Sequence, residues 1–169
     1  MSVLTGKRCL ITGASGGLGE ALANEFGRCG CRLILTGRNL ARLEAVAYGL
    51  PGNARLEEIL VADINSDSGM EYLIDRVETI SKGLDILINN AGVFPVGRFE
   101  SISKIELDEC LSVNLRSPSL LCRAFVAGMS ANGWGRIVNV VSSSAYAGFA
   151  DTVAYCAAKH GLLGLSRDR

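Results

Sequence analysis

A glycine-rich turn near the N-terminus constrains the fold of this chain more than any other stretch. Gly13, Gly16, Gly17 and Gly19 stand between a short apolar run and a longer run with apolar residues four apart. Glycine allows a tight turn and the close approach of a ligand to the backbone, and the amides at a helix start attract phosphate. An ordinary strand-to-helix turn would not need four glycines, so the pattern predicts a phosphate site.

Two common phosphate-binding loops differ from this turn. No Lys-Ser/Thr pair follows the glycines. This excludes a P-loop, because nothing would reach the terminal phosphates and magnesium. The spacing also differs from the G-x-G-x-x-G of the commonest dinucleotide sites. A dinucleotide remains the ligand that the turn predicts.

Strand-like and helix-like runs alternate along the chain. Apolar runs of strand length cover 8–12, 32–36, 59–62, 84–89 and 136–141, and helical patterns cover 17–28, 40–48, 67–81, 103–129 and the stretch from about 152 to the end. Strands joined by helices of this length imply a parallel sheet with helices on both faces. The prediction is one α/β domain over 1–169 with a doubly wound parallel sheet.

Composition excludes several classes of protein. The 17 basic and 17 acidic residues cancel, so no excess of charge favours nucleic acid. The N-terminus has no apolar segment of a signal peptide, and the apolar runs are too short to span a membrane. The six cysteines are scattered and there is one histidine, so no metal-ligand spacing exists. The cysteines are typical of free thiols in a reducing cytoplasm, where we expect the protein to reside.

The residues after the second predicted strand indicate which dinucleotide binds. An NAD site usually places an acid there, to bond the ribose 2′-hydroxyl. This chain instead has Thr36-Gly37-Arg38-Asn39, with no acid. The planar guanidinium group of arginine suits a 2′-phosphate. The sequence therefore predicts NADP(H) in preference to NAD(H), with Arg38 as a solvated residue at a helix start as the alternative.

Tyr155 and Lys159 are four positions apart in the last helical stretch, so their side chains are predicted on one face of the helix. A nearby ammonium group favours the phenolate form of tyrosine, which suits proton transfer near neutral pH. Ser142 follows the apolar run 136–141 and is placed to hold a substrate oxygen beside that phenol. The three residues predict general acid–base chemistry.

These motifs, in this order and spacing, resemble those of the short-chain dehydrogenase/reductase family over about residues 7–166. The matching positions are the turn from Thr12 to Gly19, Asp63, the run Asn89-Asn90-Ala91-Gly92, Asn114, Ser142, and Tyr155 with Lys159. Within the family, 3-oxoacyl-carrier-protein reductases and related carbonyl reductases are the most similar. The resemblance implies a Rossmann-like fold and hydride transfer between NADP(H) and a small-molecule carbonyl or secondary alcohol.

The resemblance also implies the cofactor contacts. Asp63 and Ile64 would flank the adenine, and Arg38 and Asn39 would face the 2′-phosphate. The ribose and pyrophosphate would lie along Gly13, Ser15, Gly17, Leu18 and Gly19, and the ribose of the nicotinamide along Asn90, Ala91 and Gly92.

Four residues receive catalytic roles from the same resemblance. Tyr155 would be the general acid in carbonyl reduction and the base in alcohol oxidation. Lys159 would favour the phenolate and bond the hydroxyls of the nicotinamide ribose, and Ser142 would polarise the carbonyl. Asn114 would hold a water that joins Lys159 to solvent as a proton relay.

Pro118 lies four residues after Asn114 within a helical stretch. Proline lacks the N–H that would bond the carbonyl four residues earlier, and its ring pushes that carbonyl aside. We therefore predict a local kink that frees the Asn114 carbonyl for the relay water. The alternative is a kink that only fits the helix to the sheet.

Relatives in this family usually continue further than this chain, through later strands and a substrate loop. The chain is therefore predicted to lack the last strands of the family fold, which would leave the fifth strand as an unpaired apolar edge. Two hypotheses follow. The first is an NADP(H)-dependent oxidoreductase. The second is a truncated, catalytically impaired product that binds cofactor weakly, or that pairs with a full-length relative and modulates it. The last two helices are predicted to form that contact or a homo-oligomer.

Overall fold

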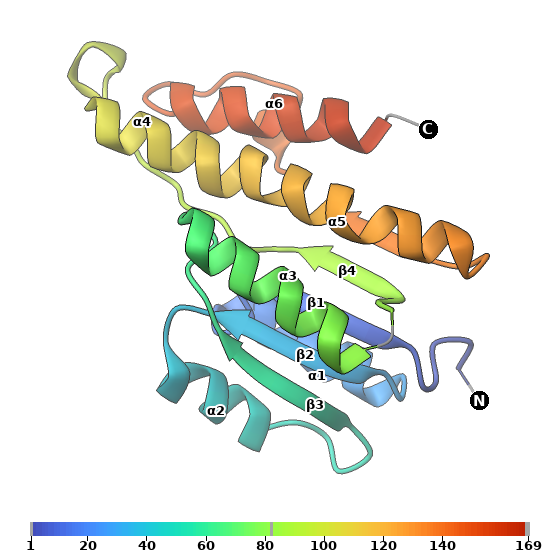
Figure 1. The fold of residues 1–169 in the computed structure, drawn as a ribbon. Coiled ribbons are helices and arrows are strands. Elements are labelled where there is room, and N and C mark those ends of the chain that lie inside the picture. Colours follow the sequence, from blue (N-terminus) through green and yellow to red (C-terminus); the bar gives the residue numbers. More distant parts are fainter. Residues whose placement is uncertain (1, 82, 168–169) are drawn as a thin grey trace.

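Five parallel strands form one sheet in the computed structural model, which describes residues 2–81 and 83–167 (Figure 1). The order across the sheet is β3-β2-β1-β4-β5. The order reverses at β1, because β2 pairs with one of its sides and β4 with the other. A reversal of this kind opens a crevice at the carboxyl ends of the strands. The bounds are β1 Arg8–Thr12, β2 Arg32–Gly37, β3 Arg55–Val61, β4 Ile86–Asn89 and β5 Arg136–Asn139.

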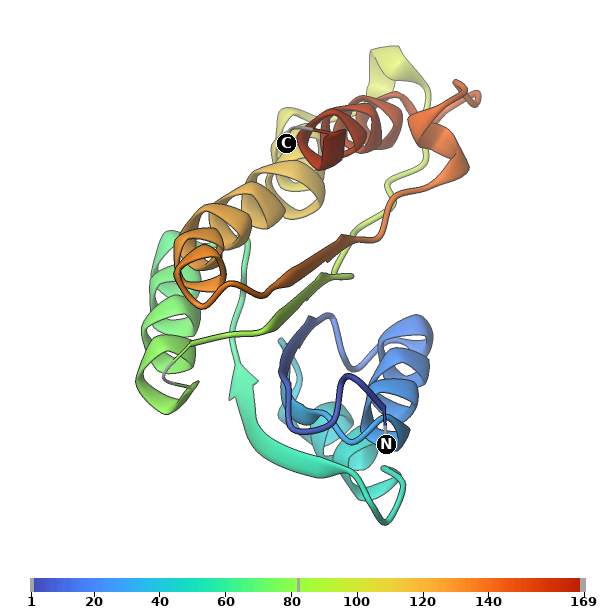
Figure 2. The same ribbon diagram turned by 90° about the vertical axis from the view of Figure 1, so that its right-hand side faces the viewer.

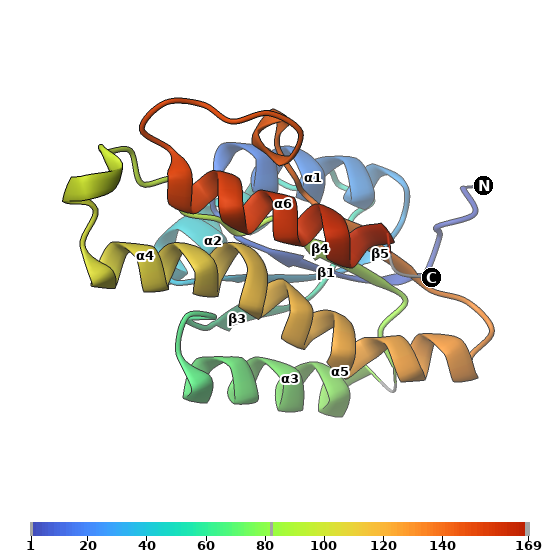
Figure 3. The same cartoon turned by 90° about the horizontal axis from the view of Figure 1, so that it is seen from above.

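Helices connect the strands and cover both faces of the sheet (Figure 2). α1 and α2 pack on one face, and α3 and α5 pack on the other. α6 lies alongside α4 and α5 (Figure 3). The predicted doubly wound α/β fold is thereby confirmed. The bounds are α1 Gly17–Arg28, α2 Leu40–Tyr48, α3 Asp67–Ser81, α4 Lys104–Leu111, α5 Ser117–Ala131 and α6 Val153–Arg167, with short turns η1 Phe99–Ser101, η2 Ser112–Arg116 and η3 Ser143–Ala145.

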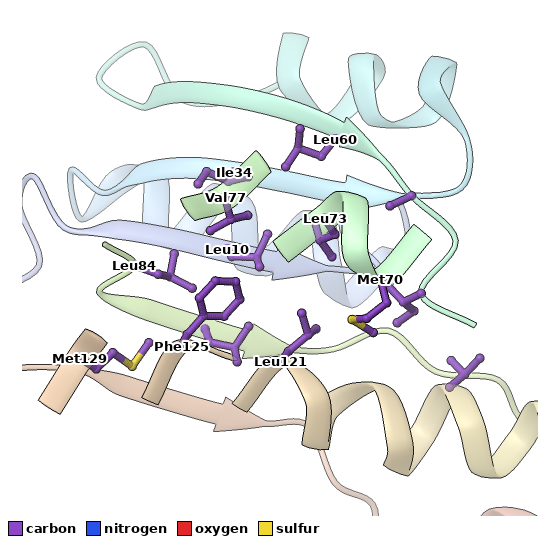
Figure 4. Close-up of a cluster of buried hydrophobic side chains, with 14 residues drawn as sticks. Leu10, Ile34, Leu60, Met70, Leu73, Val77, Leu84, Leu121, Phe125 and Met129 are labelled. Carbon is purple, nitrogen blue, oxygen red and sulfur yellow. The ribbon is translucent and has the colours of Figure 1, made fainter. Parts of the chain in front are cut away.

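Alternate side chains of the central strand enter two separate cores. Leu10 of β1 packs in one core with Leu73 of α3 and Phe125 of α5, whereas its neighbour Ile11 packs in the other core with Leu43 of α2. Successive side chains of a strand point to opposite faces, which explains the division. Figure 4 shows the first core, between the sheet and the helices α3 and α5. β1, β2 and β4 are buried on both faces of the sheet.

The start of β3 differs from the prediction, which placed this strand over 59–62. The strand begins four residues earlier, at Arg55. Its first half is charged rather than apolar because Glu57 accepts a hydrogen bond from Arg32 Nη2 (2.6 Å) and another from Arg8 Nε (3.4 Å). Ion pairs between neighbouring strands replace the apolar pattern on which the prediction depended.

Two other strands are shorter than predicted. β4 covers Ile86–Asn89 rather than 84–89, and β5 covers Arg136–Asn139 rather than 136–141. The two strands pair over the same four positions, and the last pair is Asn89 with Asn139. The pairing ends there because Asn90 turns toward β1, with its N–H directed at the Thr12 hydroxyl (3.0 Å).

The helix predicted over 103–129 consists of three segments, α4, η2 and α5, and continues to Ala131. η2 is a π-helical turn, in which Ser117 N–H bonds to Ser112 O, five residues earlier. It lies directly before Pro118, which has no N–H to donate. The π turn thus stands where the sequence predicted a kink, and the kink itself and the release of the Asn114 carbonyl stay predictions.

Candidate active site

The hydroxyl of Thr12, at the end of β1, connects the glycine turn to the end of β4. It accepts hydrogen bonds from the backbone N–H groups of Asn90 and Ala91, each at 3.0 Å, and donates to Ile88 O at 3.3 Å. Thr12 is almost completely buried. This bonding uses the full capacity of the hydroxyl and places the run after β4 beside the glycine turn.

The side chain of Asn90 strengthens the same connection. Its Nδ2 donates to Thr12 O at 2.9 Å and to Gly13 O at 3.1 Å. Both amide hydrogens are thus directed at the backbone of the glycine turn. Asn90 holds that backbone in shape, and its neighbours Ala91 and Gly92 line the pocket that the turn helps to form.

Two glycines of the turn have no room for a side chain. Gly13 has a positive φ of 62°, and a Cβ there would lie 2.8 Å from Ala91 Cα. A Cβ on Gly19 would lie 2.2 Å from Gly13 O, so the first turn of α1 packs directly on the backbone of the loop. By contrast, a Cβ on Gly17 would meet nothing within 4 Å. The start of α1 is therefore uncovered, and its amides can receive an anion.

A pocket of about 470 Å³ opens along this turn, in the crevice beside β1. The structure brings most of the predicted dinucleotide contacts to its wall; Gly17, Tyr155 and Lys159 are the exceptions. The predicted residues that line it are Gly13, Ser15, Leu18, Gly19, Arg38, Asn39, Asp63, Ile64, Asn90, Ala91 and Gly92.

Basic and amide groups form one end of this pocket, between β2 and α2. Arg38 is largely exposed, and its Nη1 lies 3.9 Å from Glu109 Oε1 of α4. Asn39 caps α2, because its Oδ1 accepts the N–H of Arg42 at 3.0 Å. Arg42 also lines the pocket, four positions after Arg38. The sequence analysis did not include Arg42, although its helical spacing from Arg38 was the available signal.

Asp63 and Ile64 lie on the opposite side of the pocket, after β3. Asp63 Oδ1 accepts the N–H of Asn65 at 3.0 Å, which orders the loop before α3. Ile64 is almost fully buried and belongs to the core under α3. Val113 completes this wall and was also missed, although it immediately precedes the predicted Asn114.

A second pocket of about 270 Å³ contains Tyr155 and Lys159. It shares Leu18, Asn90, Gly92 and Val93 with the first pocket, so the two spaces are adjoining. The ring of Phe94 packs edge-on against the ring of Tyr155, with centroids 4.6 Å apart. Phe94 was not predicted, because an aromatic residue in a loop carries no positional signal in the sequence.

Lys159 is 4% exposed and reaches inward from α6. Its Nζ donates to Val140 O at 2.8 Å and lies 5.5 Å from the centroid of the Tyr155 ring. Burial lowers the pKa of Lys159 from its ordinary value of 10.5, and the neighbouring Cys110 raises it by a smaller amount. The structure thus places the ammonium group beside the tyrosine, as the four-residue spacing predicted.

Asn114 lies in the π turn and is completely buried. Its Nδ2 donates to Val93 O at 2.8 Å and to Cys110 O at 3.0 Å, and its Oδ1 has no hydrogen-bond partner among residues 2–81 and 83–167. A Cβ on Gly92 would lie 2.7 Å from that Oδ1, so only glycine fits at position 92. Asn114 therefore fixes the backbone of the run that lines both pockets.

Ser142 begins the short turn η3, where its Oγ accepts the N–H of Ser144 at 3.1 Å. It follows Val140 and Val141, which line the pocket of Tyr155. The serine is half-buried and is not among the residues that line that pocket. Its capping role was not predicted, since a serine before a 3₁₀ turn has no distinct sequence pattern.

The combined site fits a dinucleotide. The two adjoining pockets form a path from Arg38 to Tyr155, and the uncovered start of α1 lies between them. No cluster of three metal-ligating side chains occurs within residues 2–81 and 83–167. Over the same residues, no helix combines the length and apolar character that crossing a bilayer requires.

Comparisons with known proteins agree with this geometry. A sequence profile described as short chain dehydrogenase matches residues 7–168. The D-threitol dehydrogenase of Mycolicibacterium smegmatis is 34% identical over 97% of this chain and 63% of its own length. The 3-oxoacyl-[acyl-carrier-protein] reductase of Pseudomonas aeruginosa is also 34% identical, over 97% of this chain and 66% of its own. The chain thus spans about two thirds of the length of these curated relatives.

A solved structure is similar over most of the chain. It is a metagenomic short-chain oxidoreductase crystallised in complex with NADP, 35% identical, with a TM-score of 0.87. The match covers 97% of this chain and 75% of that one.

Proposed function

The chain belongs to the short-chain dehydrogenase family, and on that basis we propose that it is an NADP(H)-dependent oxidoreductase that interconverts a carbonyl and a secondary alcohol. The observation that carries this proposal is the shared wall of the two pockets. Tyr155 and Lys159 lie in a space that adjoins the glycine turn, so a dinucleotide on the turn would reach the tyrosine.

The residues of the first pocket would bind the adenosine half of the cofactor. Arg38 and Arg42 would bind a 2′-phosphate, and the uncovered amides at the start of α1 would bind the pyrophosphate. Asp63 would accept from the amino group of adenine. The metagenomic relative crystallised with NADP supports the choice of NADP(H) over NAD(H).

The residues of the second pocket would carry the proton. When bound, the cofactor supplies or accepts the hydride at the carbonyl carbon. Tyr155 donates the proton from its Oη to the carbonyl oxygen in reduction and accepts it in oxidation. Lys159, with a water held near Asn114, would return the proton to the site. Ser142 would polarise the carbonyl.

The proposal also covers the cellular compartment of the protein and its contacts with other chains. Its six cysteines are free thiols, which supports a reducing compartment such as the cytoplasm. α6 lies alongside α4 and α5, and the last two helices, α5 and α6, would form a contact with a second copy or with a longer relative.

A second candidate is a binding protein without turnover. β5 is at the edge of the described sheet and exposes Val138, which favours pairing with another chain. Such a protein would bind NADP(H) weakly and modulate a full-length relative.

Two measurements on the 169-residue chain test the proposal. Thermal melts with NADPH and with NADH should show a larger rise of the midpoint with NADPH. Consumption of NADPH in the presence of a panel of ketones should then occur with the native chain and be lost in Tyr155→Phe, which keeps the cofactor-induced shift. The exposed Tyr48 provides the control, because Tyr48→Phe should keep both signals. A melt that shifts without any turnover would favour the second candidate, and a melt insensitive to both nucleotides would overturn the proposal.

A further inference from the structure

A pocket of about 420 Å³, here called the distal pocket, lies at the amino ends of the strands, away from the glycine turn. Its wall includes Arg55, which begins β3, and Cys29, which stands between α1 and β2. In Figure 1, β1 and β3 begin on the side where the N-terminus is marked. The distal pocket shares no described residue with the two pockets of the candidate active site. α1 connects the two ends, because it starts at Gly17 in the glycine turn and ends at Arg28 in this wall.

The carboxyl end of α1 forms part of the wall, and its carbonyl groups would repel an anion if they were unpaired. The carbonyls of residues 25–27 accept backbone N–H groups from the turn that follows the helix. Arg28 O accepts a hydrogen bond from Asn53 Nδ2 at 3.3 Å. Cys29 O accepts one from Thr5 Oγ1 at 3.4 Å. Every carbonyl from 25 to 29 therefore has a donor, so none faces the pocket as an unpaired acceptor.

Two arginines line the distal pocket, and none of the described residues of its wall is acidic. Arg55 is exposed and forms no ion pair within the described part of the chain. Arg28 Nη1 lies 2.8 Å from Glu25 Oε2 of the same helix, and the two side chains are 62% and 66% exposed. An exposed pair of this kind is weak, so the Arg28 guanidinium can turn to a stronger anion. Both arginines are thus available to one ligand.

The surroundings of the distal pocket add positive charge. Arg8, Arg32 and Arg55 are register partners at the starts of three adjacent strands, with about 5 Å between the Cα atoms of neighbours. Arg32 and Arg55 also line an adjoining hollow. The carboxylate of Glu57 accepts hydrogen bonds from Arg8 and Arg32, and Arg55 is left without a counter-charge. Because the whole chain has no formal net charge, the positive character of this end comes from how the arginines are arranged.

We propose that the distal pocket binds a phosphate group, either of inorganic phosphate or of a small phosphate monoester. A phosphate dianion presents three terminal oxygens and two negative charges, which suits two guanidinium groups that each donate two N–H bonds. A carboxylate has one charge and two oxygens, so a single arginine satisfies it. Asn53 donates one amide hydrogen to Arg28 O and has a second for the phosphate. The site is independent of the proposed oxidoreductase function, because it lies at the other end of the sheet.

Cys29 provides a probe inside the distal pocket, because its thiol is free and it lies half-buried in the wall. The 169-residue chain is alkylated with iodoacetamide, a neutral reagent, at constant ionic strength, and peptide mass spectrometry follows the rate at each cysteine. For a dissociation constant of about 1 mM, inorganic phosphate or glycerol 3-phosphate at about 10 mM should slow Cys29 about tenfold. Cys156, near the start of α6, is the control within the same molecule and should react at an unchanged rate.

The arginines are tested one at a time. Arg55→Gln and, separately, Arg28→Gln should weaken phosphate binding about fivefold or more, which leaves at most about threefold protection of Cys29. Arg123→Gln, at an exposed arginine of α5, is the matched control and should keep full protection. Thermal melts show whether each variant is folded. Glycerol, which lacks the phosphate, and acetate, which carries one charge, should give no protection to the native chain.

The outcomes decide the proposal. Protection by both phosphates assigns the site to the phosphate group, and stronger protection by one of them identifies its source. Equal rates at Cys29 with and without either phosphate would overturn the proposal, and so would equal protection by acetate. Undiminished protection in both folded arginine variants would overturn it as well. The oxidoreductase function is unaffected by these results, because the NADPH-induced thermal shift tests it separately.

Discussion

Arg38 Nη1 and Glu109 Oε1 lie 3.9 Å apart, and the pair joins the loop after β2 to α4 at the edge of the larger pocket. Both side chains are substantially exposed, at 65% for Arg38 and 38% for Glu109, so the pair itself adds little stability. A 2′-phosphate that approached Arg38 would meet the Glu109 carboxylate as a competitor of like charge. We therefore predict that Glu109 influences the preference between NADP(H) and NAD(H).

Glu109→Gln should tighten NADP⁺ binding about two- to fivefold and leave NAD⁺ binding nearly unchanged, because only NADP⁺ carries the 2′-phosphate. Isothermal titration with both nucleotides measures the ratio, and added salt should reduce the gain. The exposed Glu78 on α3 provides Glu78→Gln as a control for the loss of one negative charge. Equal changes for the two nucleotides would contradict the assignment.

Gly19→Ala should lower the free energy of unfolding by about 2–4 kcal/mol, because its Cβ would lie 2.2 Å from Gly13 O, and backbone atoms cannot move aside cheaply. Gly17→Ala is the matched control two residues earlier, where a Cβ meets nothing within 4 Å. It should be neutral or up to about 1 kcal/mol stabilising, since alanine favours the helix. Urea unfolding of both variants gives the comparison, and similar losses in the two would refute the packing argument.

Asn90→Asp should destabilise the chain by about 2–3 kcal/mol, because a carboxylate would face the carbonyls of Thr12 and Gly13 in place of two N–H donors. The loss should shrink at acidic pH, where the protonated carboxyl can donate one of the two bonds. Asn53→Asp is the control, since the Asn53 side chain donates to Arg28 O at an exposed site. Denaturant melts over a pH series measure both effects. A pH-independent loss would show that the two bonds are not its cause.

Lys159→Met should change how stability depends on pH. Burial lowers the pKa of Lys159 below its ordinary value of 10.5, so between the lowered pKa and 10.5 the unfolded chain binds more protons than the folded one. Stability of the native chain relative to the variant should therefore rise with pH in that window, by at most about 1.4 kcal/mol per pH unit, and be constant below it. Urea melts at stepped pH provide the difference. Lys104→Met, at an exposed lysine, should show no such rise.

The order of strands and helices could be predicted because the β1 and β2 runs are apolar enough to be recognised without their partners. The start of β3 could not be predicted, because the environment of Glu57 is created by Arg8 and Arg32 from other strands. A charged strand of this kind resembles a loop until its neighbours are known. The same reason limits predictions of strand ends, which depend on how far the partner strand extends.

The residues of the candidate site also fall into those that the sequence predicted and those that it did not. The glycines and the Tyr155–Lys159 pair were predicted from spacing and Arg38 from the lack of an acid after the second strand, and the structure brings all of them except Gly17 to adjoining pockets. Phe94 could not be predicted to face the pocket of Tyr155, and Glu109 could not be predicted to lie near Arg38, because their neighbours come from distant segments. Ser142 was assigned a substrate contact, and the additional capping bond to Ser144 appears only in three dimensions.

The π turn at η2 determines how α4 is rotated about the helix axis relative to α5. An α-helix advances about 100° per residue, and a π turn closes over one residue more than an α turn. The apolar stripes of α4 and α5 are therefore offset by about one residue step, although the two helices are nearly continuous. Deleting one residue from Ser112–Arg116 would give an uninterrupted helix and swing α4 around its axis, carrying Glu109 away from Arg38. In this segment, the number of residues determines which side chains of α4 face Arg38.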